Sequence, residues 1–87
     1  MNEQLIKQAQ LGIESESFLN SDIGKYIMSR AGMEFDEGVD GLLAVDPTDT
    51  AKIIKLQSQC IRASTLRQWL IDAIDSGLYA EEELKDE

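Results

Sequence analysis

Cys60 supplies the only thiol of the chain, and the sequence contains no histidine that would activate it as a nucleophile. A catalytic cysteine needs a neighbouring base or another group that lowers the pKa of its thiol. Cys60 falls instead on an apolar stripe of a predicted helix, where a small and inert buried thiol is the common occupant. We therefore predict a structural role for Cys60.

The other residue types capable of chemistry are not arranged for catalysis or metal binding. None of the seventeen acidic side chains has an evident apolar pocket that would raise its pKa for acid–base work. The glycines form neither a dinucleotide-binding fingerprint nor a P-loop, and residues 36–41 lack the ligand pattern of an EF-hand. We expect no enzyme activity, no cofactor and no metal ion.

The chain is strongly acidic, because seventeen acidic and eight basic residues give it a net charge of −9. This balance, without a basic patch interleaved with aromatic residues, argues against direct nucleic-acid binding. The acids gather near residues 34–40 and 81–87, where they form solvated surface or, alternatively, imitate a phosphate backbone and dock on a basic partner. The predicted acidic surface consists of Glu34, Asp36, Glu37, Asp40, Glu81, Glu82 and Glu83.

Apolar residues recur at helical spacing along most of the chain, and no segment shows the alternation of a strand. Asp46 as N-cap and Pro47 at the first helical position predict the start of a helix, while Gly77 predicts a helix end in the left-handed conformation. Asn20 or Ser21 is expected to cap the second helix, unless the first and second helices form one continuous helix through Asp22. The sequence predicts one all-α domain, residues 1–87, with helices at about 2–19, 22–45, 48–76 and 80–85.

The two central helices are expected to form an antiparallel hairpin, because the connection between them is short. Phe35 belongs to an apolar series that repeats every seven residues, and its replacement by alanine should cost about 3–5 kcal/mol if it is buried. The second helix also contains four glycines, so packing must compensate for them or the helix bends or breaks near Gly38 and Gly41. The residues expected to face one another are Met28, Phe35 and Leu42 on one helix and Leu56, Cys60, Ala63 and Leu70 on the other.

A broad apolar face on the third helix predicts association between copies of the chain. One N-terminal helix of modest amphipathicity is too little to cover this face together with the apolar stripe of the second helix. We expect the exposed part to be buried in a closed homodimer, in which Trp69 is either a core residue or an interface anchor. Arg67 interrupts the stripe and either extends to solvent or pairs with an acid of another helix. The predicted interface consists of Leu66, Trp69, Leu70 and Ile74.

No apolar run approaches the roughly 18 residues that span a bilayer, and the N-terminus lacks the pattern of a signal peptide. We therefore expect no membrane partner and a cytoplasmic protein.

Three segments and two further residues resemble small helical proteins that tailed bacteriophages and prophages encode, commonly among their head and packaging genes. They are FLNSDIG at 18–24, VDPTD at 45–49 and AIDSG at 73–77, followed by Ala80 and Leu84. The resemblance covers most of the chain and implies a phage origin, a place in the host cytoplasm or the virion, and no catalytic residues.

Together, these features predict a non-enzymatic helical interaction protein that self-associates and serves virion assembly. The alternative hypothesis is an acidic inhibitor that occupies a basic nucleic-acid-binding site on a host or competing protein, and a regulator or antitoxin-like module is a third.

Overall fold

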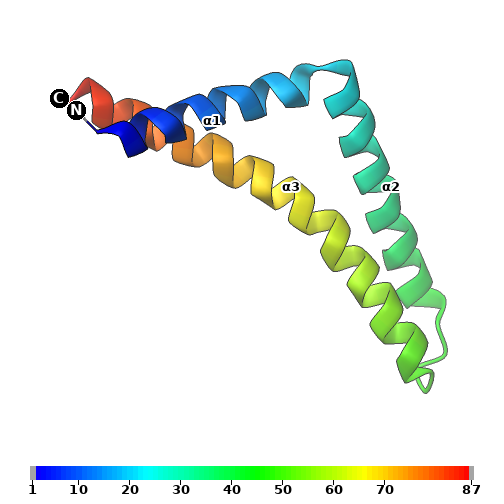
Figure 1. Cartoon of the computed structure of the whole chain (residues 1–87). Helices are drawn as coiled ribbons and strands as arrows, with labels where there is room; N and C mark the ends of the chain where they lie inside the picture. Colours follow the sequence, from blue (N-terminus) through cyan, green and yellow to red (C-terminus); the bar gives the residue numbers. More distant parts are fainter. Residues whose placement is uncertain (1, 87) are drawn as a thin grey trace. The chain divides into compact units, whose positions relative to one another are not determined.

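The computed structural model describes residues 2–86, which form three α-helices joined by short turns (Figure 1). Helix α1 spans Glu3–Asn20, α2 spans Asp22–Ala44 and α3 spans Thr50–Lys85. No strand occurs within residues 2–86. The prediction of an all-α fold is confirmed.

A serine turn separates α1 from α2. The Ser21 hydroxyl donates a hydrogen bond to the Phe18 carbonyl at 2.6 Å and accepts one from the Gly24 N–H at 3.0 Å. Ser21 therefore caps α2, as one of the two residues predicted for that role. A Cβ atom at Gly24 would overlap the Phe18 carbonyl oxygen, so this corner needs a glycine.

Helix α2 runs without interruption through Gly38 and Gly41 and ends at Ala44. Of the two alternatives for these glycines, compensation by packing or a break in the helix, the break is therefore not found. Both face α3 at close range, because an added Cβ would lie 2.5 Å from the Cys60 sulfur at Gly38 and 2.6 Å from a Leu56 methyl group at Gly41. Close packing compensates for the low helix propensity of glycine at these positions.

The predicted start of α3, with Asp46 as N-cap and Pro47 as the first helical residue, is wrong. The Asp46 carboxylate instead accepts hydrogen bonds from the N–H and the hydroxyl of Thr48, at 2.8 and 2.7 Å, and closes a turn. Helix α3 follows Asp49, whose carboxylate accepts a hydrogen bond from the Lys52 N–H at 3.1 Å and caps the helix. The fixed φ of proline suits a tight turn as well as a first helical turn, which explains the error.

The predicted end of this helix at Gly77 is also wrong, and so is the separate helix at residues 80–85, because α3 continues to Lys85. No glycine among residues 2–86 has a positive φ, so Gly77 does not act as a left-handed cap. An added Cβ at Gly77 would lie 2.7 Å from the Gly12 Cα and 3.1 Å from the Gln8 carbonyl oxygen. Glycine at this position allows two helix backbones to approach each other.

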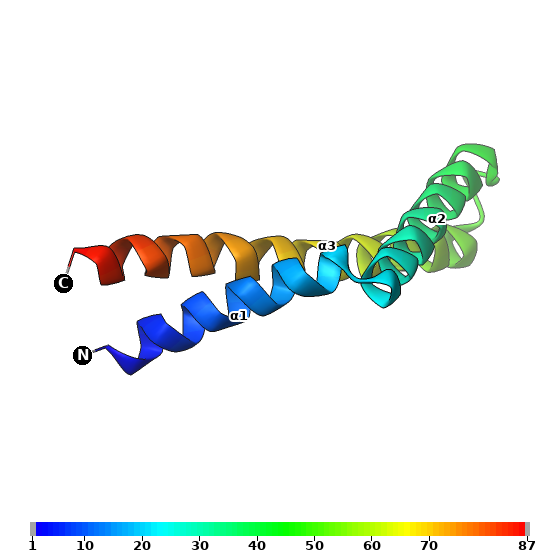
Figure 2. The ribbon, with the colours of Figure 1, turned by 90° about the horizontal axis from the view of Figure 1, so that it is seen from above.

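The chain divides into two compact units, and both α2 and α3 contribute to each of them. Unit 1 contains the residues up to Lys25 and those from Gln68 onward, which are α1, the first turn of α2 and the last part of α3. Unit 2 is Tyr26–Arg67, which contains most of α2 and the first part of α3. Within unit 1, the start of α1 and the end of α3 lie at the same end (Figures 1 and 2).

Unit 1 is held together by small residues. Ala9, Gly12 and Ser15 are the buried residues of α1, and Gly77 and Ala80 are those of α3. The Ser15 hydroxyl donates to the carbonyl of Leu11, four residues earlier, at 2.7 Å, so its burial leaves no unsatisfied donor.

In unit 2, two further contacts join α2 to α3. The Gln59 side-chain amide donates to the Glu34 carbonyl at 2.9 Å, and the Cys60 thiol lies 3.8 Å from the Phe35 carbonyl oxygen. The Phe35 side chain itself is 40% exposed, so its predicted burial against α3 is wrong. Small residues of α2 occupy the centre of the contact, whereas Met28 and Leu42 are half-buried.

Candidate protein-interaction surfaces

Unit 2 contains a groove of about 350 Å³ between α2 and α3. Its apolar part comes from aliphatic side chains of both helices, and its polar part includes one arginine from each helix. Tyr26, Ile27, Arg30, Ala31, Glu34, Gln59, Arg62, Ala63 and Leu66 line this groove.

Helical spacing places these side chains on facing sides of the two helices. Residues 27, 30, 31 and 34 of α2 are three or four positions apart, as are residues 59, 62, 63 and 66 of α3, so each set shares one face. The hydrogen bond from Gln59 to the Glu34 carbonyl connects the two helices at this position. The groove therefore has walls set by secondary structure, not by a loop.

The groove has a positive balance in an otherwise acidic chain, because Arg30 and Arg62 outnumber Glu34. Neither arginine forms an ion pair within the described residues, where Lys85 Nζ and a Glu82 carboxylate oxygen, 3.8 Å apart, make the only one. Both arginines are exposed. Two guanidinium groups beside apolar walls can bind a carboxylate-bearing segment with an apolar side chain.

The exposed side of α3 in unit 1 has complementary chemistry. Gly77 marks the side of α3 that packs on α1. Asp75 and Tyr79 are each two residues from Gly77, and two residues turn a helix by about 200°. Both side chains therefore lie on the opposite side of α3. Tyr79 is 61% exposed. We call this exposed side the acidic–aromatic ridge; it consists of Trp69, Asp72, Asp75, Tyr79 and Glu83.

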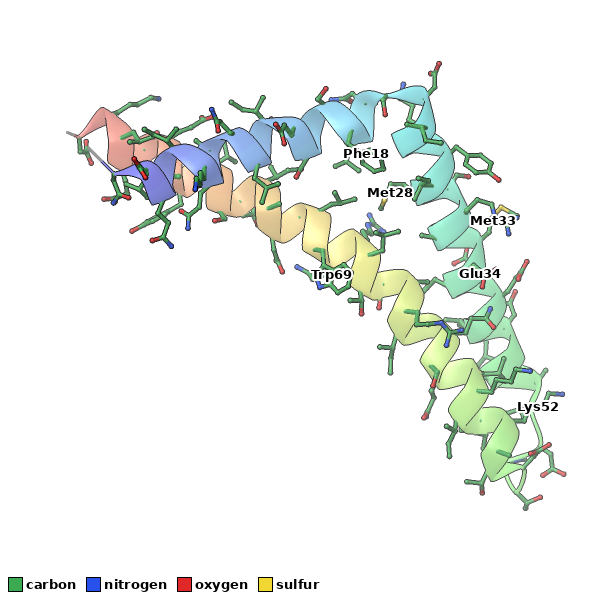
Figure 3. The ribbon with its side chains drawn as sticks, in the orientation of Figure 1. Phe18, Met28, Met33, Glu34, Lys52 and Trp69 are labelled. Atoms are coloured by element: carbon green, nitrogen blue, oxygen red, sulfur yellow. The ribbon has the colours of Figure 1, made fainter. Side chains whose placement is uncertain are left out.

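The four residues of the predicted interface differ in exposure. Trp69 is 67% exposed, so its interpretation as a core residue is wrong, and Figure 3 shows its indole ring projecting from α3. Leu66, Leu70 and Ile74 are half-buried, and Leu66 lines the groove. Arg67 is exposed and has no ion-pair partner within residues 2–86.

The predicted acidic residues are divided between the two units. Most are exposed, but Glu34 and Glu81 are half-buried. In unit 2, Glu34 lines the groove, whereas Asp36, Glu37 and Asp40 are exposed. In unit 1, Glu82 and Glu83 are exposed, and Glu82 pairs with the lysine three residues later.

Sequence reasoning missed Arg30, Arg62 and Tyr79 as candidate binding residues. The helix end predicted at Gly77 places Tyr79 outside that helix. The signal for Tyr79 was the spacing of four residues from Asp75 to Tyr79 and from Tyr79 to Glu83.

Large apolar side chains are exposed in both units, on all three helices. No large side chain of the described residues is fully buried, and the buried hydrophobic residues among them are Ala9 and Ala80. Figure 3 shows one example, Met33, on the side of α2 that points away from α3. Besides Trp69 and Tyr79, the most exposed are Leu11, Ile13, Ile23, Tyr26, Met33, Leu43, Ile54, Ile61 and Leu78.

The turn at Asp46 alters the titration of that side chain. Hydrogen bonds donated by the N–H and the hydroxyl of Thr48 stabilise the carboxylate and lower the pKa of Asp46 below its ordinary value.

Over residues 2–86, no three potential metal-ligating side chains come together, and no helix is both long and apolar enough to cross a membrane.

Comparison of the chain with protein-family models, curated proteins and solved structures gives no match.

Proposed function

We propose that this chain is a non-enzymatic helical interaction protein that self-associates, first of all as a dimer. It is phage-encoded and serves virion assembly, in the host cytoplasm or in the virion itself. The observation that supports self-association most strongly is the contrast between core and surface. Among the described residues the buried hydrophobic side chains are two alanines, while Trp69 and many large aliphatic residues are exposed.

This contrast has an energetic consequence. Removing one large apolar side chain from water stabilises a protein by about 1.5–3 kcal/mol, whereas an alanine contributes much less. A short chain also buries a smaller share of its surface than a larger protein does, so many small domains depend on association. Contact between copies would bury exposed side chains such as Trp69, Ile54 and Ile61.

The architecture of unit 2 proposed here is an antiparallel hairpin of α2 and the first part of α3. Three contacts support it, with sequence separations of 15 for Gly41 and Leu56, 22 for Gly38 and Cys60, and 25 for Glu34 and Gln59. Separations that grow with distance from the turn are the pattern of two antiparallel helices. Such a hairpin presents a rigid groove to a second chain.

Electrostatic repulsion opposes association, because each copy has a net charge of −9. Exposed charges are screened beyond about 8 Å at physiological ionic strength, whereas close and partly buried pairs are screened less. The dimer should therefore tighten when salt is raised from a low to a moderate concentration.

Gel filtration coupled to light scattering, at low and at moderate salt, tests the proposal. We expect a mass near twice the 9.7 kDa of the chain, with a larger dimeric fraction at moderate salt. A mass of 9.7 kDa in both buffers at about 100 μM protein would contradict it, since even a 1 μM Kd gives mostly dimer at that concentration. A monomer would favour the acidic inhibitor, with Asp36, Glu37 and Asp40 as its exposed carboxylates.

A further inference from the structure

We propose that the groove of unit 2 in one copy binds the acidic–aromatic ridge of α3 in a second copy. This inference rests on the proposed self-association and identifies the two surfaces that meet.

The groove requires carboxylates together with an apolar anchor. Arg30 and Arg62 are exposed without an ion-pair partner in the described residues, and Leu66 contributes to the apolar part of the lining. Guanidinium groups form their strongest contacts with carboxylates, and beside aromatic rings they also form cation–π contacts. An occupant with an aromatic residue between two acids would satisfy both preferences.

The ridge offers this arrangement at helical spacing. Asp75, Tyr79 and Glu83 are four residues apart, so they lie in one line along the helix, and all three are exposed. Asp75 and Glu83 are eight positions apart, which is about 12 Å along the helix, and the groove-lining residues of α2, from Tyr26 to Glu34, cover the same length. The ridge segment and the groove therefore match in length as well as in charge.

The types of residue on both surfaces also suit a protein interface. Arginine, tyrosine and tryptophan are the residues most enriched at interface hot spots. Both surfaces contain them: Tyr26, Arg30 and Arg62 in the groove, and Trp69 and Tyr79 on the ridge. Asp36 and Asp40 on α2 are also exposed acids on one side of a helix, but the residues between them are Glu37, Gly38 and Val39, none of which is aromatic. This pair is the natural specificity control.

A charge-swap experiment tests the inference in the full chain. The groove variant is Arg30→Glu with Arg62→Glu, which changes the net charge from −9 to −13, and the ridge variant is Asp75→Lys with Glu83→Lys, which changes it to −5. Each variant alone would bring like charges together, so its self-association should weaken about tenfold or more. Mixed in equal amounts, the two variants should form a heteromer, because each groove then meets a ridge of opposite charge.

Two variants of equal net charge serve as controls. Lys52→Glu with Arg67→Glu also gives −13, and Asp36→Lys with Asp40→Lys also gives −5, at exposed positions outside both surfaces. Both controls should associate like the unaltered chain in sedimentation measurements. Circular dichroism checks that each variant keeps its helicity. If a charge reversal unfolds the chain, neutral replacements test the same surfaces and should still weaken association. These are Arg30→Gln with Arg62→Gln in the groove and Asp75→Asn with Glu83→Gln on the ridge.

The outcomes separate this inference from the proposed function. A monomeric unaltered chain would contradict self-association itself. An unaltered chain that associates, together with groove and ridge variants that associate equally well, would overturn only the docking of ridge in groove. Failure of the mixture to restore association, when each variant alone has lost it, would show that the two surfaces are not partners of each other.

Discussion

Replacing Gly77 by alanine should destabilise unit 1, although alanine is the better helix former. The added methyl group would lie 2.7 Å from the Gly12 Cα and 3.1 Å from the Gln8 carbonyl oxygen. Both neighbours are backbone atoms, which cannot rotate away as a flexible side chain would. Helices α1 and α3 would have to separate at this point by about 1 Å to reach ordinary van der Waals distance.

The magnitude follows from two opposing terms. Alanine in place of a helical glycine stabilises by about 1 kcal/mol. Overpacking against rigid neighbours costs about 1–3 kcal/mol, and the upper part of this range applies because the separation also loosens the contacts of Ala9 and Ala80. We expect a net loss of about 1–2 kcal/mol, which lowers the Tm of a domain of this size by about 4–16 °C.

Urea unfolding followed by far-UV circular dichroism, at one protein concentration for all variants, measures this effect. Gly32→Ala is the matched control, because nothing lies within 4 Å of an added Cβ at that position. The control should gain about 0.5–1 kcal/mol through helix propensity alone. If Gly77→Ala stabilised the chain as much as Gly32→Ala does, the close approach of α1 and α3 would be refuted.

Four further outcomes are expected. Asp49→Ala should cost about 1 kcal/mol in urea unfolding as the loss of an N-cap, and an unchanged stability would contradict that role. Thr48→Val should raise the lowered pKa of Asp46, measured by NMR titration of its carboxyl carbon. Because folding lowers this pKa, the Asp46 carboxylate stabilises the folded chain at pH values above its unfolded-state pKa. This stabilisation is lost as the pH falls through the pKa of Asp46 in the folded chain. Trp69→Ala should weaken self-association about tenfold or more with unfolding of the monomer little changed, and equal dimer formation would exclude the indole from the interface. Phe35→Ala should cost about 1–2 kcal/mol, below the 3–5 kcal/mol of a fully buried ring, as its 40% exposure indicates; a loss within the larger range would show burial in an assembly.

The helices themselves could be predicted because their signals are local. Apolar spacing marks all three, and Ser21 carries the hydroxyl that a helix N-terminus prefers. The segment from Asp46 to Asp49 was ambiguous, since an aspartate before a proline suits a turn and a helix start equally well. The choice depends on which carboxylate reaches the first free N–H groups, and in this chain it is Asp49.

Gly77 shows what a local pattern cannot supply. A glycine after an apolar stripe is typical of a helix end, but it is equally typical of a place where two helix backbones touch. The second interpretation requires knowing that Gly12, which is 65 residues away in sequence, lies against it. A helix end at Gly77 places Tyr79 outside the helix, so its alignment with Asp75 and Glu83 does not follow from the predicted helices.

The groove was beyond sequence reasoning for a related reason. Arg30 and Arg62 are unremarkable on their own helices, and they become a pair only when α2 and α3 are packed together. The exposure of Trp69 likewise depends on whether another element covers it. Periodicity identifies which face of a helix is apolar, but not what packs against that face.

Sedimentation equilibrium of the unaltered chain over about 1–100 μM at moderate salt tests self-association most directly, because it measures mass without reference to shape. We predict that the weight-average mass rises with concentration from 9.7 kDa towards twice that value. A mass that stays at 9.7 kDa over the whole range would contradict self-association.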